Sequence, residues 1–373
     1  MSHSAKILPF PPRSLAECLS PREWELRARD FLAIPADKRT DADRETFLCS
    51  PEILLSICAL LRRNRDLAPT AVLSEAASIY QWISRPSCDL GLFDERDYFL
   101  GETALVAGGA SRLVGKREEA FLWLDRAEAG FRHTMNPAPG LANVAYARLA
   151  LRFEMGRHQD VLELTPSLEA SFTKLHMEVE AAKCRLLLAM TLKMTGEHSG
   201  AIELLDRMHR NPALSSDLFL RAKILAELGD LHQLQGQFGL AMEAFQEASE
   251  LLQEKEPSPA RADLKLCVGA TYKALGSLGA AKEAYRAAQQ EYSALEMPGP
   301  VAYTRLLIAE TLLEMNHDRE AEWEILAALP AIDDIKMVPE GLAAMGLLRE
   351  SVRRRNTDTS ALKQLRAQLQ ASR

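Results

Sequence analysis

The sequence predicts an all-α protein of the α-solenoid class, in which helical hairpins stack one upon the next. The first observation is a recurring turn residue, which returns every 40 or 41 residues at Gly115, Gly156, Gly196, Gly236, Gly276, Asn316 and Asn356. The second is a small aliphatic residue five positions after each of these, at Ala120, Val161, Ala201, Ala241, Ala281, Ala321 and Ala361. A period of this length is typical of stacked supersecondary units.

The recurring glycines and asparagines indicate where each hairpin turns. Glycine adopts the left-handed backbone conformation that closes a helix without steric cost, and asparagine is the usual second choice. The composition agrees with a helical protein, because 47% of the residues are hydrophobic but only 6% are aromatic. A chain of 373 residues is too long for one compact core, yet a solenoid of nearest-neighbour contacts has no such limit.

The charge balance argues against nucleic acid or an anionic membrane as the partner. The 45 basic and 52 acidic residues give a net charge of −7, so no global attraction to a polyanion is expected. No apolar run reaches the roughly 18 residues that a membrane span requires, and the N-terminus lacks the features of a secretory signal. Reduced, buried thiols in a cytoplasmic protein are expected, because the six cysteines are widely spaced without a metal-ligand pattern. They are Cys18, Cys49, Cys58, Cys88, Cys184 and Cys267.

The pattern divides the chain into three regions. Residues 1–19 are predicted to be a disordered tail that contains three prolines. Residues 20–94 are predicted to be an N-terminal helical section. Residues 95–373 are predicted to be the solenoid, with about seven repeats and a C-terminal capping helix.

The N-terminal section contains clear helix-start signals. Ser20, which precedes a proline, and Glu23 form the pattern of a capping box. Ser50 also precedes a proline and is predicted to open a second helix in the same way, so residues 51–83 are interpreted as a degenerate leading hairpin. Asp94 is predicted to cap the long helix that runs to the first recurring glycine.

Two repeats depart from the pattern. Pro166 falls within the second helix of its unit, so this helix is expected to kink or to restart with Thr165 as a new cap. In the last unit Arg349 stands where a small residue is expected. The final helix keeps one apolar stripe and is otherwise polar, as a capping helix should be. The stripe consists of Leu362, Leu365 and Leu369.

Two neighbouring copies show the repeat most clearly, with small residues that allow close helix packing and aromatic residues that fill the space beside them. Counted from Ala222, positions 8, 11, 15, 17, 20, 24 and 27 are Gly229, His232, Gly236, Phe238, Ala241, Phe245 and Ala248. Counted from Ala262, they are Gly269, Tyr272, Gly276, Leu278, Ala281, Tyr285 and Ala288. This pattern resembles the tetratricopeptide repeat, in a longer form similar to that of bacterial sensor and regulator proteins. The resemblance implies a right-handed superhelix whose concave face is lined by the first helix of each repeat.

The same resemblance implies which side chains face the groove. In tetratricopeptide proteins, positions 2, 5, 6, 9, 12 and 13 of each first helix usually line it. The polar or aromatic residues at these positions are Glu102, Arg112, Asn143, Tyr146, Glu154, Lys183, Lys193, Lys223, Glu227, Asp230, Gln233, Asp263, Lys273, Tyr303, Glu310, Glu314, Glu350, Arg353 and Arg354. The family's Lys/Asn clamp for chaperone tails is not reproduced in adjacent repeats, which argues against a chaperone adaptor.

Three arginines occupy positions where apolar packing is expected, namely Arg148, Arg152 and Arg185. A buried guanidinium needs a carboxylate, carbonyls or an anionic ligand. One interpretation is an internal pair with residues such as Glu154 or Glu180. The other is an anion-reading patch in the groove, and the residues leave both open.

No pattern in the sequence indicates catalysis, a cofactor or a metal. The segment from Gly108 to Arg117 superficially resembles a phosphate loop, but its spacing is wrong and no Ser or Thr follows Lys116. The histidines lack ligand spacing within a unit, and no catalytic signature is present. The protein is therefore predicted not to be an enzyme and to bind no cofactor.

The sequence thus predicts a non-enzymatic scaffold that binds a protein or a peptide on its concave face. The second hypothesis is a ligand-gated regulator, in which a bound peptide changes the superhelix and so acts through another protein. It resembles the bacterial peptide-sensing regulators in repeat length, but their DNA-binding helix-turn-helix is not recognisable in residues 1–95. The identity of the partner and the oligomeric state stay open.

Overall fold

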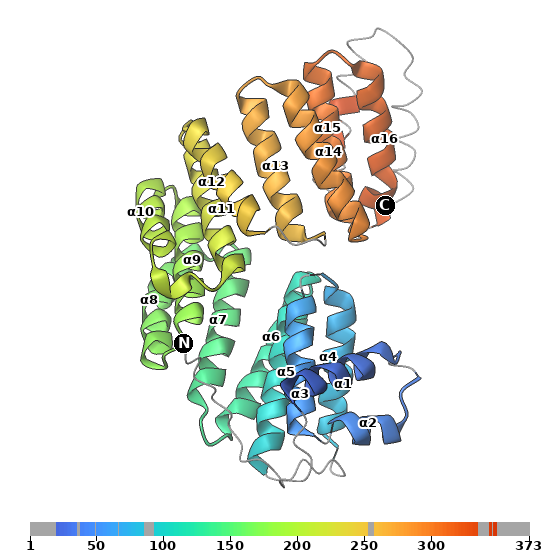
Figure 1. Ribbon diagram of the computed structural model, residues 1–373, viewed down its shortest axis with the longest axis vertical. Helices are drawn as coiled ribbons and strands as arrows, with labels where there is room; N and C mark the ends of the chain where they lie inside the picture. Colours follow the sequence, from blue (N-terminus) through green and yellow to red (C-terminus); the bar gives the residue numbers. More distant parts are fainter. Residues whose placement is uncertain are drawn as a thin grey trace. The chain divides into compact units, whose positions relative to one another are not determined.

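The structure is a computed structural model, and it describes residues 20–35, 38–48, 50–65, 67–85, 93–252, 257–334, 343–344 and 346–348. All regular elements within these ranges are helices, as predicted (Figure 1). The earlier ones are α1 (Pro21–Ala33), α2 (Asp41–Leu48), α3 (Pro51–Asn64), α4 (Pro69–Ile83), α5 (Phe93–Leu113), α6 (Arg117–Arg132), α7 (Ala138–Glu154) and α8 (His158–Lys174). The later ones are α9 (Glu178–Thr195), α10 (His198–His209), the short η2 (Pro212–Leu214), α11 (Leu218–Leu234), α12 (Phe238–Leu251), α13 (Pro259–Ala274), α14 (Leu278–Ala294), α15 (Pro298–Glu314) and α16 (Asp318–Asp334).

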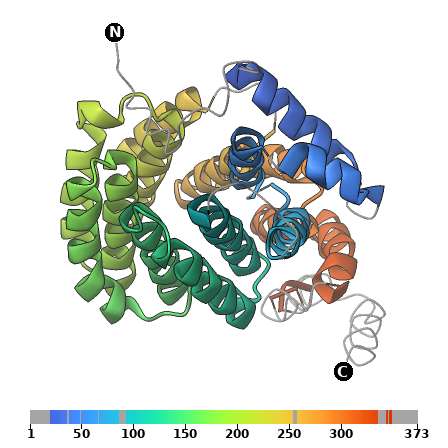
Figure 2. The same ribbon diagram turned by 90° about the horizontal axis from the view of Figure 1, so that it is seen from below.

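Contacts between helices divide the chain into two compact units. Unit 1 comprises Met1–Arg148 and unit 2 comprises Leu149–Arg373, with the division inside α7. The hairpin of α5 and α6 therefore groups with the N-terminal helices. Within unit 2, helices that follow one another in the sequence pack side by side, as Figures 1 and 2 both show.

The predicted hairpin turns are confirmed at each marker that the structure describes. Gly115, Gly156, Gly196, Gly236 and Gly276 have φ between 72° and 87°, and Asn316 has φ 63°. After each marker, the next N–H donates to the carbonyl five residues earlier; the Glu197 N–H, for example, lies 2.8 Å from the Leu192 carbonyl oxygen. This bond closes the helix end in a Schellman motif, which requires the left-handed residue.

Two further left-handed turns have no glycine or asparagine to mark them. His176 has φ 57° and Glu296 has φ 53°, and both lie between one hairpin and the next. The Met177 N–H donates to the Phe172 carbonyl at 2.9 Å, as at the hairpin turns. The closing hydrogen bond thus holds two residues other than glycine in a conformation that such residues uncommonly adopt.

Position 8 of the first helix packs against position 24 of the second, as the small and aromatic residues predicted. A Cβ placed on Gly229 would lie 2.4 Å from Phe245, and one on Gly269 would lie 2.5 Å from Tyr285. Both rings are almost completely buried. Where position 8 is Ala189 instead, position 24 holds a leucine in the same core cluster. The two positions share a nearly constant volume.

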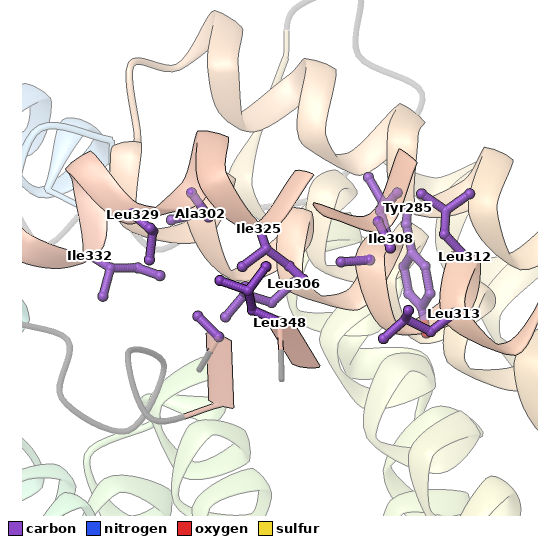
Figure 3. Close-up of a cluster of buried hydrophobic side chains, with 14 of the residues drawn as sticks. Tyr285, Ala302, Leu306, Ile308, Leu312, Leu313, Ile325, Leu329, Ile332 and Leu348 are labelled. Carbon is purple, nitrogen blue, oxygen red and sulfur yellow. The ribbon is translucent and has the colours of Figure 1, made fainter. Parts of the chain in front are cut away.

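A core cluster at the end of the described chain shows how hairpins are joined (Figure 3). It unites Tyr285 from α14, Leu306 from α15 and Ile325 from α16 with Leu348. Ile325 and Leu348 are completely buried. Because each hairpin supplies only part of the cluster, none buries its apolar face alone.

The two helix-start signals of the N-terminal section have different outcomes. Ser20 and Glu23 form the predicted capping box at the start of α1. Ser50 makes no side-chain bond to the backbone of α3; its hydroxyl instead donates to Glu52 at 2.8 Å. Ser50 is the N-cap residue of α3 and precedes its proline, so the predicted helix start is confirmed. The side-chain cap is not formed, because a neighbouring carboxylate takes up the hydroxyl.

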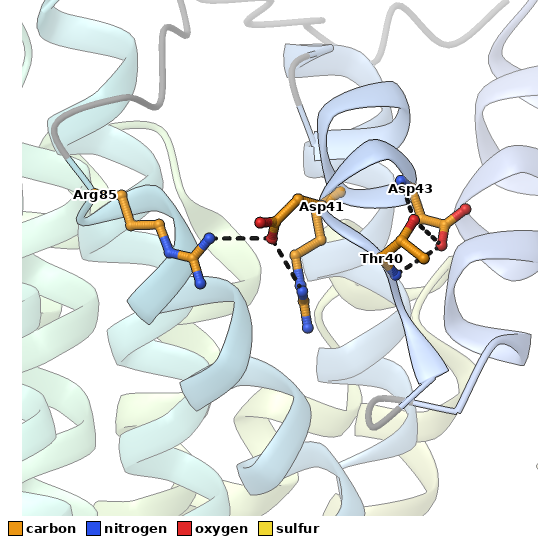
Figure 4. Close-up of polar contacts among 5 residues, drawn as sticks. Thr40, Asp41, Asp43 and Arg85 are labelled. Atoms are coloured by element: carbon orange, nitrogen blue, oxygen red, sulfur yellow. Dashed lines mark hydrogen bonds and ion pairs between the residues drawn. The ribbon is translucent and has the colours of Figure 1, made fainter.

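The cap of α2 was not anticipated from the sequence (Figure 4). The Asp43 N–H donates to the Thr40 hydroxyl at 3.1 Å, and the Thr40 N–H donates to the Asp43 carboxylate at 2.8 Å. The Thr40 hydroxyl also donates to the Asp43 carboxylate at 2.7 Å, and this bond, together with that from the Thr40 N–H, holds the pKa of Asp43 below its ordinary value. Asp41 lies 3.1 Å from Arg85, which links the start of α2 to the residues that follow α4.

Two expectations for the N-terminal section are corrected. Residues 51–83 do form helices, but α4 packs mainly against α5 and α3 mainly against α1. They are therefore not a closely packed hairpin. The long helix α5 begins at Phe93, so Asp94 lies in its first turn and does not precede it as a cap.

The helix that contains Pro166 does not restart there. α8 continues from His158 to Lys174, and the Thr165 hydroxyl donates backwards to the Val161 carbonyl at 2.6 Å. A cap would accept a bond from a later N–H. The prediction of a new cap at Thr165 is thus wrong, because its hydroxyl serves the preceding turn.

Several predictions lie outside the described residues. They concern the tail 1–19, Arg349, the turn at Asn356, the capping helix that ends the chain, and the cysteines Cys18, Cys49 and Cys88.

Burial raises the pKa of the Cys58 thiol to about 11 and that of Cys184 to about 12, as expected for thiols kept inside the core. No helix of the described chain is both long and apolar enough to cross a membrane.

Candidate partner-binding face

Most of the predicted groove residues of unit 2 that the structure describes lie on four first helices, α9, α11, α13 and α15. Several of them contact one another. Lys193 on α9 reaches two carboxylates on α11. Its Nζ lies 2.5 Å from Glu227 and 3.3 Å from Asp230. The Lys193 and Glu227 side chains are 17% and 19% exposed, so this pair is largely shielded from water.

A second lysine repeats the arrangement two first helices further along the chain. Lys273 on α13 lies 2.8 Å from Glu310 and 3.1 Å from Glu314, both on α15. Each lysine thus holds two carboxylates of a neighbouring first helix. We call these six residues the cross-helix ladder: Lys193, Glu227, Asp230, Lys273, Glu310 and Glu314.

The ladder changes the titration of its lysines. Burial by itself would lower the pKa of Lys193, but Glu227 and Asp230 outweigh it and raise the pKa above the ordinary value. The same balance raises the pKa of Lys273. Both ammonium groups therefore stay charged through the neutral range, and their stabilising contribution disappears only as the pH rises through the raised values.

Between the two ladder pairs, a side-chain hydrogen bond joins α13 to α11. The Thr271 hydroxyl lies 3.2 Å from the Gln233 side-chain oxygen and 2.9 Å from the Cys267 carbonyl. Burial, and then the charge and hydrogen bond of Asp230, raise the pKa of Cys267. This thiol is therefore uncharged at neutral pH and unsuited to act as a nucleophile.

Three further predicted groove residues of unit 2 are more exposed. The Lys183 side chain is 43% exposed and lies 3.8 Å from Glu180. Lys223 is exposed, and its ammonium stands 4.5 Å from the centre of the Phe219 ring. Tyr303 is 44% exposed. The Lys183 and Tyr303 side chains can therefore meet a partner at the surface.

Arg148 has two internal carboxylate partners. Its guanidinium lies 2.6 Å from Asp125 and 2.5 Å from Glu128, both on α6. Asn143 and Tyr146 precede it on α7 and, like Arg148, belong to unit 1. These three predicted residues thus belong to a different compact unit from α9, α11, α13 and α15.

Arg152 and Arg185 also have carboxylates within ion-pair distance. Arg152 lies 3.6 Å from Asp160, and Arg185 lies 2.7 Å from Glu169. Both partners are on α8, a second helix of a repeat. The sequence had suggested Glu154 and Glu180 and did not identify these residues, because pairing across a hairpin depends on how its two helices are rotated.

Two features of this face were missed at the level of sequence. Phe219 precedes the first position of its repeat, yet it stacks with Lys223 one turn later, a spacing that does signal contact on a helix. The Tyr292 hydroxyl donates to the Asp263 carboxylate from the second helix of the same hairpin.

No group of His, Cys, Asp and Glu placed to hold a metal occurs in the part of the chain that the structure describes.

Comparison with solved structures identifies the architecture. The Rap protein complexed with competence and sporulation factor superposes with a TM-score of 0.54 and 13% identity, covering 94% of this chain and 100% of that one. The chain has the tetratricopeptide-repeat fold. NprR in complex with its cognate peptide NprX gives a TM-score of 0.52 at 12% identity, covering 79% and 84% of the two chains. The Rap conjugation gene regulator of plasmid pLS20 with the Phr* peptide gives 0.50 at 16% identity, covering 94% and 98%.

No protein-family model and no curated protein matches the sequence. The likeness to the tetratricopeptide-repeat structures is therefore one of fold.

Proposed function

We propose that the protein is a non-catalytic scaffold that binds a peptide, or an extended segment of another protein, along the first helices of unit 2. The observation that carries this proposal is the register of the predicted groove residues. Lys193, Glu227 and Lys273 stand on three successive first helices and meet partners on neighbouring ones. Exposed side chains on the first helices, including Lys183 on α9 and Tyr303 on α15, offer hydrogen bonds and charge to an extended chain.

The fold supports the same proposal. NprR was solved with a cognate peptide and the pLS20 regulator with the Phr* peptide, and both share the tetratricopeptide-repeat fold with this chain. A stack of hairpins places one first helix beside the next, which creates an extended surface suited to a ligand with many contact points.

The test compares charge reversal on the first helices of unit 2 with charge reversal on its second helices. Lys183→Glu with Lys223→Glu is expected to remove proteins or peptides that the wild-type protein retains from a lysate of its source cells. Both side chains are exposed, so the fold should be preserved. The measurement is quantitative mass spectrometry of the retained material.

Arg207→Glu with Arg286→Glu is the matched control, because both arginines lie on second helices, α10 and α14. Arg207 is exposed, and the Arg286 side chain is 42% exposed. The charge change is the same, and retention should resemble the wild type. If the two double variants lose the same amount of retained material, or if neither loses any, binding by the first helices of unit 2 is contradicted.

A second candidate function is regulation through a bound peptide. The observation that favours it is the cross-helix ladder, since a ligand that draws Lys193 or Lys273 from its carboxylates would change how adjacent first helices are held. Small-angle scattering should then differ between the free and the peptide-saturated protein. Unchanged scattering at demonstrated saturation would leave the scaffold function and remove the regulatory one.

A further inference from the structure

A cavity of about 480 Å³ opens in unit 2 beside Tyr303 and Glu310, two of the predicted groove residues of α15. It is lined by Tyr303, Leu306, Leu307, Glu310, Ala343, Gly346 and Leu347. The first four stand at positions 2, 5, 6 and 9 of one repeat, and the other three at positions 2, 5 and 6 of the next. The cavity thus lies between two successive first-helix segments, on the face proposed to bind a partner.

The cavity exists because the second of these segments carries small residues. Position 5 is a leucine at Leu186, Leu266 and Leu306, but it is Gly346 in the next repeat. A Cβ added to Gly346 would meet nothing within 4 Å. Ala343 is likewise small at position 2. The missing side-chain volume leaves a space of the size that ordinary ligand pockets have.

The lining is apolar except at one edge. Leu306 and Leu307 supply aliphatic walls, and the Tyr303 ring is 44% exposed beside them. Among the described residues of the lining, Glu310 is the single charged one, and its side chain is 47% exposed. An apolar side chain bound here would bury its surface against these walls.

The charge at this edge is negative in sum. Glu310 shares the ammonium of Lys273 with Glu314, so one positive charge faces two carboxylates. A cation brought to Glu310 would leave Lys273 with Glu314 as its partner. An incoming carboxylate would meet like charge, which costs binding energy.

We propose that this pocket receives an aliphatic or aromatic side chain of a bound peptide, and that Glu310 pairs with a lysine or arginine next to it. The inference rests on the proposed peptide-binding function and names the chemistry of the ligand. The small residues supply the space, the leucines and Tyr303 supply the apolar contact, and Glu310 supplies selection for a basic neighbour.

Selection from a displayed library of random twelve-residue peptides tests the proposal on the full-length protein. The enriched peptides are expected to place Lys or Arg beside a large apolar residue. Synthetic copies of them are then measured by fluorescence anisotropy. Gly346→Leu should fill the cavity without a clash and weaken binding by about tenfold or more, because a buried anchor carries much of the affinity. Gly279→Leu is its control, since that glycine also has open space around it and lies on α14.

Charge reversal tests the second half of the proposal. Glu310→Lys should weaken the basic peptides by about tenfold or more, and Glu283→Lys, on the exposed side of α14, should change binding less than about twofold. Circular dichroism confirms that each variant is folded.

The outcomes separate the inference from the function on which it rests. Enriched peptides that are acidic, that lack a large apolar residue, or that bind Gly346→Leu like the wild type would overturn the inference. If such peptides bind the double variant Lys183→Glu with Lys223→Glu more weakly than the wild type, the first helices of unit 2 stand as the binding surface. A library with no enriched peptide would overturn the inference and the proposed function together.

Discussion

Gly229→Ala is expected to destabilise unit 2 by about 1–3 kcal/mol, while Gly239→Ala should be neutral or stabilising by up to about 1 kcal/mol. The two glycines lie on adjacent helices of one hairpin, α11 and α12. A Cβ on Gly229 would stand 2.4 Å from the buried Phe245 ring, whereas a Cβ on Gly239 would meet nothing within 4 Å. The same methyl group therefore overpacks one site and only improves helix propensity at the other.

Phe245→Leu should rescue the Gly229→Ala variant. The double variant reproduces the pair of Ala189 with Leu205, which the preceding repeat already packs in its core. Urea unfolding of all four proteins gives the coupling free energy, and hydrogen exchange of α11 and α12 shows where stability changes. Additive effects of the two substitutions would show that positions 8 and 24 do not share a volume.

Lys193→Met is expected to destabilise unit 2 by about 1–3 kcal/mol, because two carboxylates then face each other without their shared cation. Glu227 is only 19% exposed and Asp230 36%, so water screens them incompletely. Lys183→Met is the control on the same helix. Its side chain is 43% exposed and 3.8 Å from its carboxylate, so its loss should cost no more than about 0.5 kcal/mol.

The pH dependence of Lys193→Met follows from the raised pKa of the lysine. A lysine with a raised pKa contributes its full stabilisation below the ordinary value of 10.5 and loses it only above. The deficit of the variant should therefore be constant between about pH 7 and 9 and shrink under more alkaline conditions. Adding Glu227→Met should restore part of the lost stability at neutral pH. A double variant less stable than Lys193→Met would contradict the repulsion argument.

The turns show how far local sequence determines structure. Gly236 and the other recurring markers identify their own conformation, because the preference for a left-handed backbone belongs to the residue itself. His176 and Glu296 adopt that conformation without any such preference. There the hydrogen bond that closes the helix decides the backbone, so no pattern of residue types could reveal these turns in advance.

The candidate face shows the same division. The period of the repeat placed Lys193 and Glu227 at groove positions of successive first helices, 34 residues apart in the sequence. It did not indicate that one lysine would hold two carboxylates. Arg148 is a clearer case, since its partners Asp125 and Glu128 depend on the packing of two helices rather than on position in a repeat.

By itself, the sequence determined the helical hairpins, the positions of their turns and the residues that each first helix turns to one side. These properties depend on single-residue backbone preferences and on the period of apolar side chains, both of which act within a few residues. Only the tertiary structure decided which charges pair, that α4 packs against α5, and that a cavity opens beside Gly346. Those properties depend on distances between helices, and such distances are set by side-chain volumes brought together from different repeats.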